Sequence, residues 1–210
     1  MRRLASTAIA MALLLWGCEA LKTQLSEAPT VYTLTGGTAN PAPQANAKPP
    51  SAAAGPTLIV SAPHAAPGFD SPHMMYLRQA DKLEYFAHNQ WVDTPARMLA
   101  PLIVAAVERS GAFRAVVQTP SPAGGELRLD TEVRRLQHEF IDKPSRVRFT
   151  LRAYLVDNAT RKVIATREFE AAVPAASENP QGGVTAANSA VQTVLENLAA
   201  FCAETARGRK

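Results

Sequence analysis

Two stretches between residues 127 and 155 alternate polar and apolar side chains, and this alternation constrains the fold more than any other feature. A third strand-like stretch follows them. In the first stretch Leu127, Leu129, Thr131 and Val133 stand between charged residues, until the phase slips at residues 134–136. A period of two predicts half-buried strands, and the phase slip predicts a bulge or a strand end.

The second and third stretches predict partners for this strand. Residues 146–155 place apolar side chains on one face and mainly arginines on the other, and residues 163–171 form the third strand after a turn at 157–160. Short connections join antiparallel neighbours, so the sequence predicts an antiparallel meander with one face in water.

Two segments have helical spacing instead. Thr94-Pro95 provides an N-cap hydroxyl followed by proline at the first helical position, and Gly111 is placed to end this helix. Pro101 inside it predicts a kink or a later start. A second helix begins after a loop predicted over 174–183 and carries one apolar stripe from Val184 to Cys202.

Shorter apolar runs complete the predicted elements. Residues 57–60 predict a buried strand, residues 113–117 predict a strand directly after the first helix, and residues 74–77 and 83–86 predict a hairpin. The fold class that follows is α/β of the α+β kind, with a mixed, largely antiparallel sheet and two principal helices.

The amino-terminal segment is typical of an export signal. Arg2 and Arg3 precede an apolar stretch that is too short to span a bilayer comfortably. Leu15, Gly17 and Cys18 then resemble the bacterial lipobox, in which cleavage falls between the glycine and the cysteine and the thiol is acylated. A twin-arginine export signal is the weaker alternative.

Composition divides the rest of the chain. Residues 36–56 contain one charge, Lys48, and no large apolar side chain, which predicts a linker. The predicted segments are a signal peptide (1–17), a tether (18–29), a short strand (30–35), the low-complexity linker (36–56), a folded domain (57–205) and a basic tail (206–210).

Motifs for chemistry are missing from the sequence. The chain has 2 cysteines and 4 histidines without metal-ligand spacing, and a net charge of +4 is low for a nucleic-acid-binding protein. Cys202 lies on the apolar stripe of the last helix, which predicts a buried, inert thiol. We therefore predict no enzyme, no cofactor, no metal site and no nucleic-acid partner.

Four arginines are the candidate interaction residues. They project from the solvent-exposed face of the predicted meander and are Arg128, Arg146, Arg148 and Arg152. One interpretation is a solvated face with acidic partners across the strands; the other is a docking face for an acidic partner or for phospholipid head groups. Trp91, before the first helix, packs in the core in one interpretation and anchors an interface in the other, if it is exposed.

The order of these segments resembles that of the ABC-type transport auxiliary lipoproteins, the PqiC-like family. The resemblance covers about residues 30–205 and includes Tyr32-Thr33-Leu34, Leu58-Ile59-Val60, the stretch from Leu83 to Leu99, Ser110 to Val116 and the helix start at Ala187 to Val191.

This resemblance implies a domain similar to the amino-terminal domain of TolB. It also implies an outer-membrane lipoprotein, anchored on the periplasmic face, that acts as an auxiliary component of an MCE-type ABC system for intermembrane lipid transport. The implied partners are an MCE-family periplasmic protein with its permease and ATPase, and further copies of the chain in a homo-oligomer.

Two other functions remain open from the sequence. One is a TolB-like or pilotin-like envelope lipoprotein that binds an outer-membrane protein. The other is a hydrolase of weak signature around His64, Asp70, Ser71 and His73, which would need these groups to converge in a pocket.

Overall fold

The computed structural model describes residues 28–37 and 55–208, and in these residues nine strands form one sheet with two helices. The strands are β1 (Thr30–Tyr32), β2 (Thr57–Val60), β3 (His64–Ala65), β4 (His73–Leu77), β5 (Leu83–Trp91), β6 (Ala115–Gln118), β7 (Leu127–Glu139), β8 (Arg146–Asp157) and β9 (Val163–Pro174). The helices are α2 (Pro95–Arg109) and α3 (Pro180–Arg207). The predicted signal and lipobox, with Gly17 and Cys18, lie outside the described residues.

The long strand β7 connects the two halves of the sheet. Along one edge it runs antiparallel to β8 over its whole length, and β9 continues the antiparallel order beyond β8. Along its other edge β2, β3 and β4 follow one another, all parallel to β7. Strand β6 is added through β2, and β5 and β1 are added through β4. The predicted mixed, largely antiparallel sheet is confirmed.

A bulge in β7 reverses which side chains face the interior. Pairing with β8 shifts between Val133 and Arg135, so that Val133 lies opposite Leu151 and Arg135 opposite Thr150. The buried side chains therefore have odd numbers before the bulge and include Leu136 and His138 after it. This is the phase slip that the sequence shows at residues 134–136.

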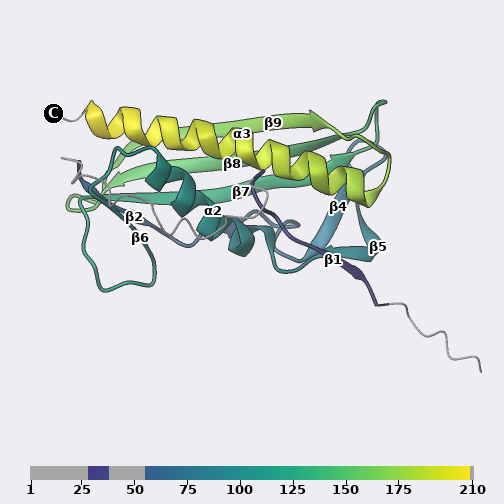
Figure 1. The fold of residues 1–210 in the computed structure, drawn as a ribbon, viewed down its shortest axis with the longest axis horizontal. Coiled ribbons are helices and arrows are strands. Elements are labelled where there is room, and N and C mark those ends of the chain that lie inside the picture. Colours follow the sequence, from purple (N-terminus) through teal and green to yellow (C-terminus); the bar gives the residue numbers. More distant parts are fainter. Residues whose placement is uncertain (1–27, 38–54, 209–210) are drawn as a thin grey trace, which may run out of the picture.

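Both helices cover the same face of the sheet (Figure 1). Helix α3 lies along β8 and β9 and contacts α2, which packs against β6, β3 and β7. The core fills the space between this layer and the sheet, where Leu99, Ile103, Val191, Leu198, Phe149 and Leu151 are fully buried. The opposite face of the sheet, which carries the predicted arginines, has no helix over it in the described part of the chain.

Helix α2 begins at the predicted position. Thr94 is its N-cap and accepts a hydrogen bond from the Arg97 amide, so the exposed Pro101 does not delay the helix. Gly111 follows the C-terminal cap with φ +62°, a conformation that glycine adopts without strain.

Helix α3 begins earlier than the sequence suggested. Asn179 is the N-cap and accepts from the Gly182 amide at 2.9 Å, so residues 180–183 are helical rather than part of a loop. Helix α3 also continues to Arg207, past the domain end expected at residue 205. Glycines 182 and 183 disfavour a helix intrinsically, but Gly183 permits close packing on His138 of β7, and Gly182 lies against Ser177 of the preceding loop.

The short amino-terminal strand is part of the fold. Strand β1 pairs in parallel with the end of β5, and Leu34 is buried in the core. The Asn188 side chain of α3 then accepts hydrogen bonds from the backbone amides of Thr35 (2.6 Å) and Gly36 (3.2 Å). The fold thus begins upstream of the boundary expected at Thr57.

The close contact between α3 and β7 gives a test of the packing. A Cβ atom on Gly183 would lie 2.5 Å from Nδ1 of His138, a buried ring whose Nε2 is 2.8 Å from Ser145 Oγ. We expect Gly183→Ala to lower the free energy of unfolding by about 1–3 kcal/mol through overpacking, as measured by urea denaturation.

Gly124→Ala is the matched control, because a Cβ atom there meets nothing within 4 Å. It should change the free energy of unfolding by less than about 0.5 kcal/mol. Equal stability of the two variants would contradict the packing described for α3.

Candidate functional site

The four predicted arginines lie on the uncovered face of the sheet, and each forms an ion pair. Arg128 binds Asp130 two residues along β7 at 2.9 Å, and Arg146 binds Asp142 at 2.6 Å. Arg152 of β8 binds Glu168 of β9 at 2.8 Å, and Arg148 binds the carboxylates described next. The geometry is that of the first interpretation, a face on which acidic side chains neutralise the arginines.

Arg148 is the centre of a network that crosses three strands. Its Nε and Nη2 atoms donate to the two oxygens of Glu139 at 2.8 and 3.1 Å, while its Nη1 atom binds Glu170 of β9. Gln137 also donates to Glu139 at 2.9 Å, and the hydroxyl of Thr150 donates to Glu170 at 3.0 Å. A bidentate guanidinium–carboxylate pair fixes both side chains.

These contacts keep both groups of the central pair charged. Burial alone would raise the pKa of Glu139, but the hydrogen bonds from Arg148 and Gln137 outweigh it, and the pKa lies below its usual value. The bond to Glu139 likewise raises the pKa of Arg148. The pair is therefore ionised at neutral pH.

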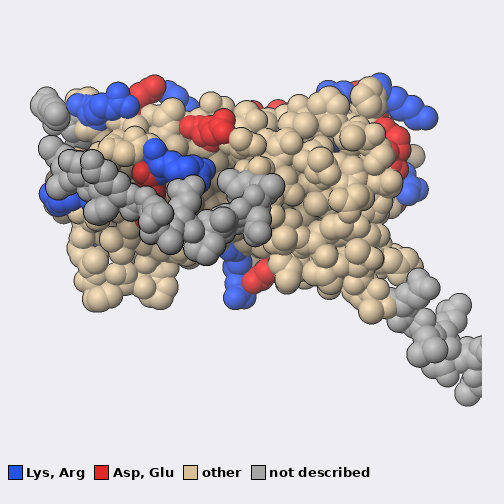
Figure 2. All heavy atoms as spheres, viewed as in Figure 1, with Lys and Arg blue, Asp and Glu red and all other residues tan. Residues whose placement is uncertain are grey.

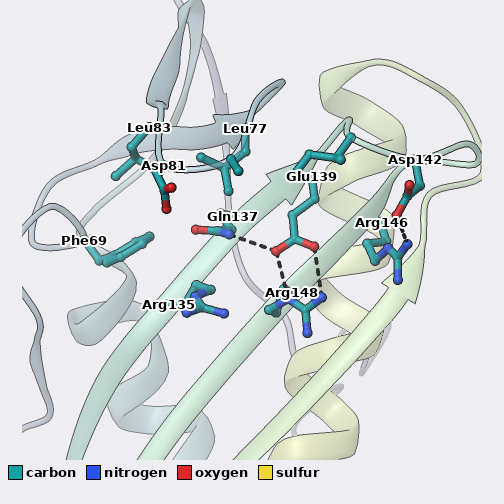
Figure 3. A pocket seen from close by; sticks show the side chains of 12 residues that line it. Phe69, Leu77, Asp81, Leu83, Arg135, Gln137, Glu139, Asp142, Arg146 and Arg148 are labelled. Carbon is teal, nitrogen blue, oxygen red and sulfur yellow. Dashed lines mark hydrogen bonds and ion pairs between the residues drawn. The ribbon is translucent and has the colours of Figure 1, made fainter.

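Beside this network the uncovered face is hollowed into a cavity of about 570 Å³. Figure 3 shows its floor, made by side chains of β7 and β8, and its wall, made by the β4–β5 hairpin and by Phe69. The lining residues are Phe69, Leu77, Ala80, Asp81, Leu83, Arg135, Gln137, Glu139, Ile141, Asp142, Arg146 and Arg148.

Most of these residues were not singled out from the sequence. Of the predicted set, only Arg146 and Arg148 line the cavity, whereas Arg128 and Arg152 do not. The phase slip before Leu136 was the available signal, because it turns Gln137 and Glu139 onto the same face as the arginines.

The helix-covered side differs in character. In the view of Figure 2 the charged side chains form small separated groups, and most of the visible surface is uncharged. The exposed positions of α3 are mainly polar and neutral, such as Thr185, Ser189, Gln192 and Asn197. The cavity and its charged floor thus distinguish the uncovered face.

Trp91 does not fulfil the condition set for an interface anchor. Its exposed fraction is 3%, and it packs in the core cluster next to β1 and the start of α2. The residue ends β5 on the side of the sheet that the helices cover, which explains its burial. The core interpretation is the one that the structure supports.

The remaining candidates are not brought together. Cys202 is buried, and burial raises the pKa of its thiol to about 12, which is typical of an inert cysteine. His73 stacks on Tyr85 with ring centroids 4.3 Å apart, and Ser71 Oγ accepts a hydrogen bond from the backbone amide of His73. The described residues contain no cluster of His, Cys, Asp and Glu that could hold a metal ion.

The sequence model of the ABC-type transport auxiliary lipoprotein component matches residues 32–199. The chain therefore belongs to this family, as its segment order suggested, and the family is not a class of enzyme. No curated protein matches the chain. Within residues 28–37 and 55–208, neither helix is long and apolar enough to cross a membrane.

Solved structures share the fold. The crystal structure of protein XCC0632 from Xanthomonas campestris is 25% identical and superposes with a TM-score of 0.69, covering 86% of this chain and 95% of that one. An uncharacterized protein with 14% identity superposes with a TM-score of 0.62 over 84% of this chain and 99% of its own. These matches support the mixed α+β architecture.

The buried carboxylate of the network gives the second test. We expect Glu139→Gln to lower the free energy of unfolding by about 1–3 kcal/mol, because it leaves donors of Arg148 and Gln137 without an ionised acceptor. The change should be measured by thermal or urea unfolding at neutral pH.

Asp142→Asn is the matched control on the same rim. Asp142 pairs with Arg146 in an exposed position, where an ion pair contributes between about 0 and 1 kcal/mol. If both variants lost the same free energy of unfolding, the Glu139–Arg148 pair would stabilise the fold no more than an exposed ion pair does.

Proposed function

We propose that the protein is a non-enzymatic, lipid-anchored auxiliary component of an MCE-type ABC transport system for intermembrane lipid transport. Its place would be the periplasmic face of the outer membrane. The observation that carries this proposal is the family match over residues 32–199, which follows a lipobox-like Leu15-Trp16-Gly17-Cys18 sequence.

The anchor proposal limits where the domain can be. Acylation of Cys18 by several chains would give stable attachment to a bilayer, which a single chain does not. Twelve residue steps separate Cys18 from Thr30, the first residue of β1. A fully extended chain of that length spans at most about 40 Å. The β1–β5 edge of the sheet would therefore lie within this distance of the membrane.

The rest of the domain would meet protein partners. We propose that these are an MCE-family periplasmic protein with its permease and ATPase, together with further copies of this chain. Strand β9 supports such assembly, because in the described residues it pairs only with β8 and leaves one edge of twelve residues open. Open strand edges readily accept another strand.

The anchor has a direct test. Cys18→Ala removes the thiol that would be acylated, and we expect the variant to move from the outer-membrane fraction to the soluble periplasmic fraction. Fractionation of the envelope followed by immunoblotting measures this. Cys202→Ala, which changes the buried cysteine, is the control and should stay with the membrane fraction. If Cys18→Ala also stayed with the membrane fraction, the anchor proposal would be contradicted.

The partners need a separate test. We expect a tagged chain, captured from detergent-solubilised envelope, to enrich an MCE-family protein and its permease and ATPase relative to cells with the untagged chain, as measured by mass spectrometry. Capture of a single outer-membrane protein without transporter subunits would instead favour a pilotin-like role and would contradict the transport proposal.

A further inference from the structure

The cavity on the uncovered face lies where an apolar part of the sheet meets a charged part. In the register of the strands Leu77 of β4 is next to Leu83 of β5 on one side and to Glu139 of β7 on the other. Leu83 and Ile141 remain 39% and 51% exposed, although both are large aliphatic residues that line the cavity. One wall thus offers apolar surface to a ligand, and the floor offers polar groups.

Arg135 is the cation on this floor with unused hydrogen-bonding capacity. Its side chain is 45% exposed, and its contact in the described part of the chain is a 4.0 Å approach to Glu170. That carboxylate already accepts hydrogen bonds from Arg148 and Thr150. The donors of the Arg135 guanidinium are therefore available to an anionic group in the cavity.

Asp81 is the corresponding anion on the wall. It lies in the turn of the β4–β5 hairpin with φ +65°, and among the described residues it has neither an ion pair nor a hydrogen bond. Figure 3 shows its carboxylate directed into the cavity, on the side opposite to the floor that carries Arg135. A ligand cation can meet it there.

The other charges of the lining satisfy one another. Glu139 is bound by Arg148, and Asp142 by Arg146. Three arginines and three carboxylates line the cavity, so its formal charge is zero. A simple anion consequently gains little from the cavity as a whole, whereas a ligand with both charges can pair with Arg135 and Asp81 together.

We propose that this cavity binds a zwitterionic amphiphile: its phosphate or carboxylate lies against Arg135, its ammonium group against Asp81, and its apolar chain along Leu77, Leu83 and Ile141. The volume of about 570 Å³ is within the range of small-molecule sites. This ligand chemistry goes beyond the transport role proposed above, and its test needs no transport partner.

The test measures binding to the full chain carrying Cys18→Ser in every sample, so that no attached acyl chain competes for the cavity. The probes are dihexanoyl phosphatidylethanolamine below its micelle concentration, dihexanoyl phosphatidylglycerol and O-phosphoethanolamine, titrated by calorimetry. We expect the ethanolamine lipid to bind more tightly than the glycerol lipid, which lacks the ammonium group, and than the head group alone.

Variants assign the two charges. Arg135→Gln and Asp81→Asn should each weaken binding of the ethanolamine lipid by about tenfold, the effect of losing one charge-assisted contact. Asp81→Asn should also reduce the preference over the glycerol lipid. Arg128→Gln is the matched control, because Arg128 lies on the same face but outside the cavity, and it should bind like the parent chain.

Three results would overturn the proposal. They are undetectable binding of the ethanolamine lipid, parent-like binding by both Arg135→Gln and Asp81→Asn, and equal binding of the glycerol lipid. Equal affinity for O-phosphoethanolamine and the lipid would mean that the cavity takes a soluble zwitterion, and would overturn the assignment of the apolar wall. Thermal unfolding of each variant verifies that the fold is intact.

Discussion

The extra residue in β7 is the constraint on which the uncovered face depends. An unbroken alternation from Leu127 would turn Arg135, Gln137 and Glu139 toward the helices, into a core that has no partners for their charged and polar groups. The bulge instead places these three side chains beside Arg148 and leaves Leu136 and His138 inside. A single irregularity therefore completes the core and builds the cavity floor.

The ion pairs on this face explain how many charged side chains can lie close together, because the arginines are neutralised by nearby carboxylates. Carboxylates from β7, β9 and the turn before β8 bind the arginines of β7 and β8 at short range. Only part of the cavity is left to bind a ligand through charge. Arg135 and Asp81 are the cavity charges whose contacts are weak or missing in the described residues. The specificity of the proposed site depends on these two charges and not on the net charge of the cavity.

The sequence predicts the parts of this fold that depend on local order. Alternation identified β7, β8 and the bulge, the turn at residues 157–160 indicated β9 after it, and Thr94-Pro95 identified the start of α2. The sequence could not place β1 in the sheet, because three residues carry no periodic signal and their partner, β5, lies far along the chain.

The start of α3 is not predicted, because Gly182-Gly183 is typical of a loop when the contact of Gly183 with His138 is unknown. The cavity likewise joins residues 77–83 of the hairpin to residues 135–148, more than fifty positions later, so only the sheet pairing reveals it.

The parallel pairing of β1 with β5 has a mechanical consequence. A chain held at Cys18 would transmit any pull on the domain through β1, along the direction of the strand. The hydrogen bonds to β5 run across that direction, and the Asn188 contacts lie just beyond them, so the load is shared among several bonds instead of opening them one at a time. If Cys18 is anchored as proposed, β1 would therefore resist being pulled out of the sheet by a force between the membrane and the domain.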